Sequence, residues 1–112
     1  MPAESSYQAS DASGQLRLVV DMEERTWLPR HCRGDRDAFQ ALLTAYRRPI
    51  YTYLVSTGVA AADRDDIFQS IFLKVHRAAR TYQPSRPLRP WLFTIAANTV
   101  RTHFRDRRGA GP

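Results

Sequence analysis

The stretch that most constrains the fold is residues 63–82, DRDDIFQSIFLKVHRAARTY. At about 100° per residue its apolar side chains fall on one continuous arc, which is broad enough to be a buried helix face. The apolar members of this arc are Ile67, Phe68, Ile71, Phe72, Val75, Ala78 and Ala79. The opposite arc is polar apart from Leu73 at its centre. Because single exposed apolar residues are normal, this pattern alone predicts only a surface helix that packs on a core.

The residues before this stretch predict another helix. Gly34 and Asp35 form a break followed by an N-cap, since glycine ends helices and an aspartate accepts hydrogen bonds from the free amides at a helix start. Apolar residues then recur at helical spacing over residues 39–56. Pro49 lies inside this pattern, and its missing N–H predicts a kink near Tyr46.

A proline-rich loop and a last helix complete the pattern. Residues 83–90, QPSRPLRP, contain three prolines, which favour a stiff loop over a helix or a central strand. The last helix is predicted to open within residues 88–91 and to run to about Arg107. Asp63 is predicted to cap the helix at 63–82. No pair of strands is convincing, so the sequence predicts an all-α fold, a compact domain of three to four helices.

The N-terminal residues carry a weaker pattern. Residues 1–14 are rich in serine and poor in bulky side chains, which predicts a disordered segment. Beyond them LRLVV favours a short strand by propensity, whereas residues 22–32 also fit a short helix that Pro29 kinks or restarts. We therefore expect a disordered leader over residues 1–20, a helical domain over residues 21–108 and the start of a linker over residues 109–112.

Charge is distributed unevenly along the chain. Seventeen basic residues against eleven acidic ones give a net charge of +6, and Asp106 is the sole acid after Asp66. The last helix presents a narrow polar stripe made of Thr94, Asn98, Arg101, Arg105 and Arg108. Such a set suits phosphate contacts and one amide that reads a base edge. The alternative is a solvated arginine face beside the negative end of the helix.

Several classes of protein are disfavoured by the sequence. Cys32 is the single cysteine, so no intrachain disulfide forms, and its neighbour His31 points elsewhere on a helix, so we predict no metal site. We find no nucleophile–base pair and no glycine-rich phosphate loop, and therefore predict neither an enzyme nor a bound cofactor. The sequence lacks an apolar run of spanning length and a secretion signal, so we expect no membrane insertion and a cytoplasmic location.

The segment DRDDIFQSIFLKVHRA resembles the core-binding helix of bacterial sigma factors, especially the extracytoplasmic-function (ECF) group. The matching positions are Asp65, Asp66, Gln69, Phe72, Leu73 and Lys74. Ser70 departs from the glutamate that is usual in the family, and His76 stands where an aromatic is common. GDRDAFQALLTAYRRPIYTYL resembles the helix that precedes this one, and RPWLFTIAANTVRTHFRDRR resembles the promoter-facing helix that follows, in the same order and spacing.

The resemblance implies a fold of the sigma factor region 2 type and a role in transcription initiation. It implies binding to a coiled coil of the β′ subunit of the RNA polymerase core through Asp65, Asp66, Gln69, Ser70 and Leu73. It also implies recognition and melting of the minus-ten promoter element, on its non-template strand, through Lys74, Tyr82, Gln83, Ser85, Arg86, Asn98, Arg101, Arg105 and Arg108. Among these, the positions of Lys74, Tyr82 and Asn98 hold a flipped-out base in the family. An anti-sigma factor that keeps the domain inactive is the third implied partner.

Departures from the family leave the preferred base open. Residues 83–85 read Gln-Pro-Ser where Arg-Gly-Asp or Arg-Gly-Glu is common, and Thr102 replaces a frequent aspartate. The resemblance implies that Trp91 is a buried core residue, as in ECF factors. The family's second domain, which reads the minus-thirty-five element, is absent from this sequence, and we expect the sequence to be a shortened form of a longer protein.

Two alternatives remain open. The first is a helical interaction adaptor whose basic stripe is only solvated. The second is a helix-turn-helix protein that reads duplex DNA. A proline-rich loop before a long helix weighs against the second, because that motif needs a tight turn and a short recognition helix.

Overall fold

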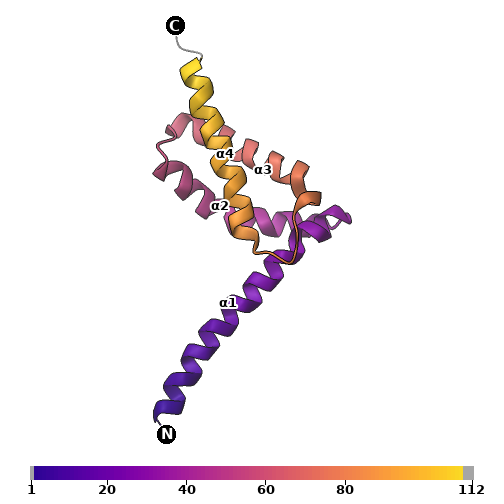
Figure 1. The fold of residues 1–112 in the computed structure, drawn as a ribbon, viewed down its shortest axis with the longest axis vertical. Coiled ribbons are helices and arrows are strands. Elements are labelled where there is room, and N and C mark those ends of the chain that lie inside the picture. Colours follow the sequence, from indigo (N-terminus) through magenta and orange to yellow (C-terminus); the bar gives the residue numbers. More distant parts are fainter. Residues whose placement is uncertain (1, 110–112) are drawn as a thin grey trace.

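Four α-helices follow one another along the chain in the computed structural model, which describes the backbone of residues 2–109 and the side chains of residues 14–108. They are α1 (Pro2–Cys32), α2 (Arg36–Ser56), α3 (Arg64–Ala78) and α4 (Leu88–Gly109), with the 3-10 turns η1 (Ala61–Asp63) and η2 (Ala79–Thr81) at the two ends of α3. No strand occurs within residues 2–109. The prediction of an all-α domain is therefore confirmed, and Figure 1 shows α4 crossing α2 with α3 beside it.

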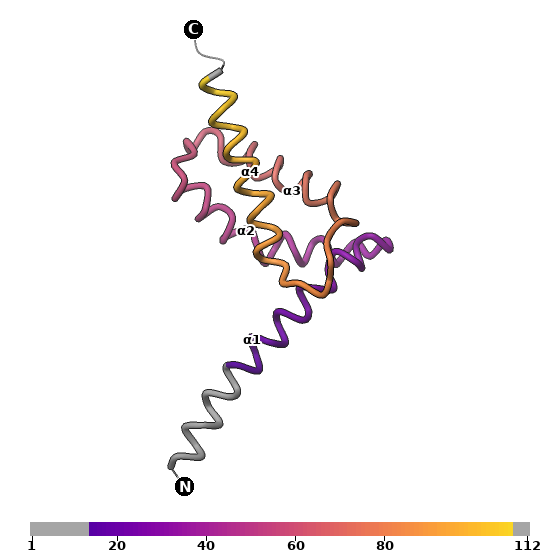
Figure 2. The backbone as a smooth tube through the Cα atoms, viewed as in Figure 1, coloured from indigo at the N-terminus to yellow at the C-terminus, as the bar shows by residue number. Residues whose placement is uncertain are grey.

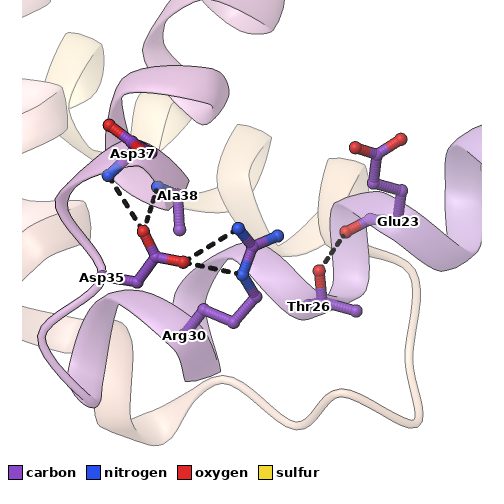
Figure 3. A network of polar contacts seen from close by, with 6 residues as sticks. All are labelled: Glu23, Thr26, Arg30, Asp35, Asp37 and Ala38. Carbon is purple, nitrogen blue, oxygen red and sulfur yellow. Dashed lines mark hydrogen bonds and ion pairs between the residues drawn. The ribbon is translucent and has the colours of Figure 1, made fainter.

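The turn between α1 and α2 forms as its sequence predicts. Gly34 has a φ of 97°, a conformation that glycine adopts without a Cβ penalty. Asp35 is the N-cap of α2, where its Oδ1 accepts hydrogen bonds from the amides of Asp37 at 3.0 Å and Ala38 at 3.3 Å (Figure 3). Its Oδ2 accepts from Arg30 Nε at 2.9 Å, and this bond is the main reason that the pKa of the Asp35 carboxyl is lowered. One carboxylate thus links the end of α1 to the start of α2.

The core is built from apolar residues repeated every fourth position, which keeps them on one face of each helix. They are Ala38, Leu42, Tyr46, Ile50 and Leu54 in α2, Ile67, Ile71 and Val75 in α3, and Leu88, Leu92, Ala96 and Val100 in α4. The arc predicted for α3 is confirmed, with Phe68 and Ala78 only partly buried at its edges. α2 continues through Pro49 without a break in the helix.

Helix α1 differs from the sequence prediction. A short strand was an alternative for LRLVV, but residues 16–20 belong to α1, which also runs through Pro29. The disordered leader predicted for residues 1–20 stays a prediction. Trp27 and Leu28 are buried in the core, while the side chains of residues 14–20 are exposed. Figure 2 shows the described part of α1 leaving the bundle as one continuous rod. Local helix formation therefore outweighs the β propensity of LRLVV, because no neighbouring strand pairs with it.

The ends of the chain bear on the predicted domain boundaries. Residues 110–112, where a linker was expected to begin, lie outside the described part, as does Met1. Gly109 still belongs to α4. The boundaries at residues 20/21 and 108/109 stay predictions.

Asp63 is the residue before α3, as predicted, but its side chain makes no capping hydrogen bond. Its φ of −101° and ψ of −10° belong to the preceding 3-10 turn rather than to the extended backbone of a usual N-cap. The carboxylate instead accepts a hydrogen bond from Arg107, and His103 Nε2 lies 3.8 Å away. Asp63 therefore ties the last turns of α4 to the start of α3.

Among residues 2–109, no helix combines the length and apolar character that crossing a membrane requires.

Candidate protein and nucleic-acid interfaces

The first candidate surface lies entirely on α3, and we call it the α3 stripe. Its members are the predicted core-binding residues Asp65, Asp66, Gln69, Ser70 and Leu73, all of which are exposed. Leu73 is 48% exposed and is the large apolar side chain of this otherwise polar set. The opposite face of the same helix is buried. The side chains of the stripe are therefore available to a partner without any change in the core.

One end of the α3 stripe is fixed by α2. The Tyr51 hydroxyl donates a hydrogen bond to Asp65 Oδ1, and this bond raises the pKa of the Tyr51 hydroxyl. The Tyr51 ring stacks on Phe68, with 4.8 Å between the ring centroids. Asp65 thus has a set orientation at the N-terminal end of α3, where a negative charge is favourable.

The second candidate surface is a cleft of about 440 Å³ at the start of α4, which we call the loop cleft. It is lined by Thr81, Tyr82, Gln83, Arg86, Pro87, Pro90, Trp91 and Thr94. Three of the residues predicted to bind DNA, Tyr82, Gln83 and Arg86, come together here. Its volume lies within the range of small-molecule pockets, about 300–1,000 Å³.

Tyr82 serves mainly as a core residue beneath the loop cleft. It is 5% exposed, and burial raises the pKa of its hydroxyl. That hydroxyl donates to the carbonyl oxygen of Arg86, and the Arg86 amide donates to the Gln83 carbonyl at 3.0 Å. Trp91, which was expected to be buried, is only partly so, and its ring centroid lies 5.3 Å from that of Tyr82. Trp91 lines the loop cleft, and part of its indole is accessible.

Lys74 and Asn98 do not line the loop cleft. Lys74 Nζ donates to Thr99 Oγ1 at 3.2 Å across the contact between α3 and α4, and Thr99 in turn donates to the Ile95 carbonyl at 2.8 Å. Asn98 Oδ1 accepts from Arg101 Nη1 at 3.1 Å on the exposed side of α4. The three positions that hold a flipped-out base in the family are thus spread over the cleft, the helix contact and the outer face of α4.

The arginine side chains in the C-terminal half of α4 divide into two groups. Arg101, Arg105 and Arg108 are exposed, and we call them the basic row. Arg105 Nε lies 3.9 Å from Asp106, a wide and exposed pair that contributes little. Arg107 forms the second group and is not part of the row, because it bonds to Asp63. The basic row continues away from the loop cleft along the same helix.

Comparison with known proteins decides the family. Residues 42–110 match the family described as Sigma-70 region 2. The chain belongs to the sigma-70 region 2 family. Relatives of this sigma region 2 domain include the RNA polymerase sigma-H factor of Pseudomonas aeruginosa, 29% identical over 81% of this chain and 48% of that protein. The sigma factor CarQ of Myxococcus xanthus is 35% identical over 67% of this chain and 43% of that protein. The ECF sigma-E factor of Escherichia coli is 29% identical over 78% of this chain and 45% of that protein.

Solved structures agree with this assignment. An engineered region 2 of sigma-E, determined in complex with GTAAAA, has a TM-score of 0.68 and 30% identity, covering 75% of this chain and 87% of that one. The sigma factor CnrH, determined in complex with the cytosolic domain of CnrY, has a TM-score of 0.67 and 29% identity, covering 71% of this chain and 52% of that one. The predicted kinship with ECF sigma factors is confirmed. The chain spans about half the length of the curated relatives it matches.

One contact in this sigma region 2 domain was missed from sequence. His31 Nε2 and His76 Nδ1 lie 2.8 Å apart, which joins the end of α1 to α3, and the Phe39 ring packs 4.5 Å from the His31 ring. Burial, with the His76 charge nearby, lowers the pKa of the His31 imidazole. Residues 14–108 hold no cluster of three or more side chains suited to a metal ion. The histidines are 45 positions apart, so no local pattern could have paired them.

The sequence also did not predict which residues of the last helix and the loop line each cleft. Thr94 was placed on the polar stripe of the last helix, but its hydroxyl donates to the Pro90 carbonyl at 2.8 Å and the residue lines the loop cleft. Trp91 follows Pro90 and lies one turn before Thr94. The helical spacing of these positions was a usable signal. Ser85 was predicted to bind DNA, yet it lines a different cleft, between the loop and α1.

Proposed function

We propose that this chain is the part of an ECF sigma factor that binds the RNA polymerase core through the α3 stripe and takes up minus-ten DNA through the loop cleft and basic row. The observation that carries the proposal is the presence of two separate exposed surfaces on a region 2 bundle. The α3 stripe offers Leu73 amid polar groups, which suits a helical partner such as the β′ coiled coil. Its place of action is the cytoplasm, where the polymerase works.

The shape and charge of the second surface support single-stranded DNA as its ligand. A base presents a flat face to stack on and an edge for hydrogen bonds, and Trp91, Gln83 and Thr94 line the cleft. Stacking on an aromatic contributes about 1–3 kcal/mol per base. The basic row supplies phosphate contacts that are independent of sequence. The engineered sigma-E region 2, solved with GTAAAA, supports the same type of ligand here.

An anti-sigma factor is the third proposed partner. The complex of CnrH with the cytosolic domain of CnrY supports such a partner for a related protein. We place the docking surface on the α3 stripe, because its mixture of Leu73 and acidic groups fits an amphipathic helix. A partner on this surface excludes the polymerase by overlap.

The test is a pair of binding measurements on the 112-residue chain. We expect retention of RNA polymerase core on the immobilised chain, together with weak, salt-dependent binding of single-stranded DNA carrying a GTAAAA-type element, tighter than binding of the duplex. Equal affinity for duplex and single strand favours the helix-turn-helix alternative. Core binding without any DNA binding favours the adaptor, and absence of both refutes the proposal.

A further inference from the structure

Arg25 of α1 holds the loop that precedes α4. Its Nη1 donates a hydrogen bond to the carbonyl oxygen of Ser85 at 2.9 Å, across 60 positions of sequence. The same guanidinium bonds to Asp21 one turn earlier, with Nε 2.9 Å and Nη2 2.8 Å from Oδ2. The Arg25 side chain is 24% exposed, and its bond to Asp21 is partly buried, whereas its bond to Ser85 lies at the exposed surface. One planar group therefore connects α1 to a loop without regular structure.

The loop segment that Arg25 holds is the wall of the loop cleft. On one side Gln83 and Arg86 line that cleft. On the other side Pro84 and Ser85 face α1 across a second cleft, which Met22, Arg25, Thr26, Pro29 and Arg33 complete. Figure 1 shows the loop passing beside α1 where the helix meets the bundle. The position of the wall is thus set from behind by α1.

Two consecutive carbonyl groups of the loop are anchored. Arg25 holds that of Ser85 from the α1 side, and the buried Tyr82 hydroxyl holds that of Arg86 from the core side. Fixing two adjacent peptide groups leaves Gln83 and Arg86 little freedom to shift relative to Trp91. Prolines at 84 and 87 restrict the same segment further. A preorganised wall discriminates ligands better than one that must order on binding.

We infer that Arg25 is a positioning residue for base recognition, acting through the Ser85 carbonyl on the shape of the loop cleft. The inference rests on the proposed function, since it assigns the cleft a base as its ligand. Arginine is required at this position because its fork reaches Asp21 and Ser85 at once, whereas the single ammonium of lysine cannot keep both geometries. Asp21 acts indirectly, because its carboxylate orients the Arg25 guanidinium.

The test compares variants of the 112-residue chain on single-stranded DNA oligomers in which one minus-ten position is varied. Arg25→Ala and Arg25→Lys should each lower the ratio of affinities for the preferred and disfavoured base by about three- to tenfold, and Asp21→Asn by less. Core polymerase affinity should not change, because the α3 stripe is untouched. Arg17→Ala, on an exposed turn of the same helix, is the matched control and should behave as the parent chain.

Amide hydrogen exchange of residues 83–87 provides a second readout. It should quicken in the Arg25 variants and stay as in the parent chain for Arg17→Ala. If exchange is faster but the ratio of affinities for the preferred and disfavoured base is unchanged, Arg25 only stabilises the loop and the inference is wrong. The inference is also wrong if Arg25→Lys keeps the affinity ratio of the parent chain. If Arg25→Ala does not fold, the affinity ratio measured for Asp21→Asn tests the inference instead, because this variant keeps the Arg25 guanidinium. Failure of the parent chain to bind any single strand refutes the proposed function itself.

Discussion

The α3 stripe and the loop cleft are built in opposite ways. The stripe consists of residues 65–73 of a single helix, and its geometry follows from helical periodicity and a buried opposite face. The cleft takes its walls from η2, the loop and α4, and α1 supports it from behind. A partner surface on one helix tolerates substitutions elsewhere, whereas a pocket of several elements depends on every contact that places them. We therefore expect substitutions that weaken binding at one surface to leave binding at the other unchanged.

The largest expected effect is competition at the α3 stripe. Titrating the cognate anti-sigma factor into a complex of this chain with the β′ coiled coil should displace the coiled coil completely, because both partners need Leu73. A fluorescence anisotropy titration measures this. Simultaneous binding with undiminished affinity contradicts the shared surface and moves the regulator's site elsewhere.

Substitution within the stripe comes next. Leu73→Ala should weaken core polymerase affinity by about tenfold, since truncating a central apolar anchor typically costs more than 1 kcal/mol. Gln69→Ala should act in the same direction. The helical circular-dichroism signal should not change, because Leu73 lies outside the core. Val55→Ala, at an exposed apolar residue on α2, is the control and should bind normally; unchanged affinity in both stripe variants removes the assignment.

Substitutions in the basic row should have a smaller effect and should lower DNA affinity equally for all sequences. Arg101→Ala or Arg105→Ala should lower the affinity for every single-stranded oligomer a few-fold and reduce the salt slope by about 0.7, the value for one phosphate contact on a single strand. Asn98→Ala should instead blur discrimination at one base. Filter binding at several salt concentrations separates these outcomes. Loss of affinity for one sequence alone in the arginine variants contradicts the phosphate role.

The smallest expected effect depends on pH. The pKa of His31 is lowered in the folded chain, mainly by burial, so the unfolded chain binds this proton more readily. The stabilising contribution is complete above about pH 6.5, the ordinary histidine value, and decreases as pH falls through it toward the folded-state pKa. The melting temperature should therefore fall between pH 7 and pH 5, and by less in His31→Gln. An equal fall in the parent chain and in His31→Gln contradicts the assignment.

The comparison also explains what the sequence could predict. Periodicity located the α3 stripe and its buried face, and the Gly34-Asp35 pair located a helix boundary, because these features depend on neighbours within one or two turns. The contacts of Arg25 with Ser85, His31 with His76 and Arg107 with Asp63 join residues 44 to 60 positions apart. No local pattern encodes such pairs. For the same reason the sequence did not reveal that Tyr82 is mostly buried or that Lys74 bonds to Thr99; their predicted contacts with DNA stay predictions.

The exposed residues 14–20 of α1 make the Arg25 contact sensitive to temperature. Asp21 lies between the anchored turn at Trp27 and the solvent-exposed residues 14–20. A helical segment without tertiary contacts is marginal in water, so the exposed residues 14–20 open more readily than the anchored turn at Trp27. Each opening of the turn at Asp21 removes the carboxylate that orients Arg25. The occupancy of the Arg25–Ser85 bond therefore follows the helix–coil equilibrium of residues 14–22, and warming should erode base selectivity well below the temperature at which the bundle melts.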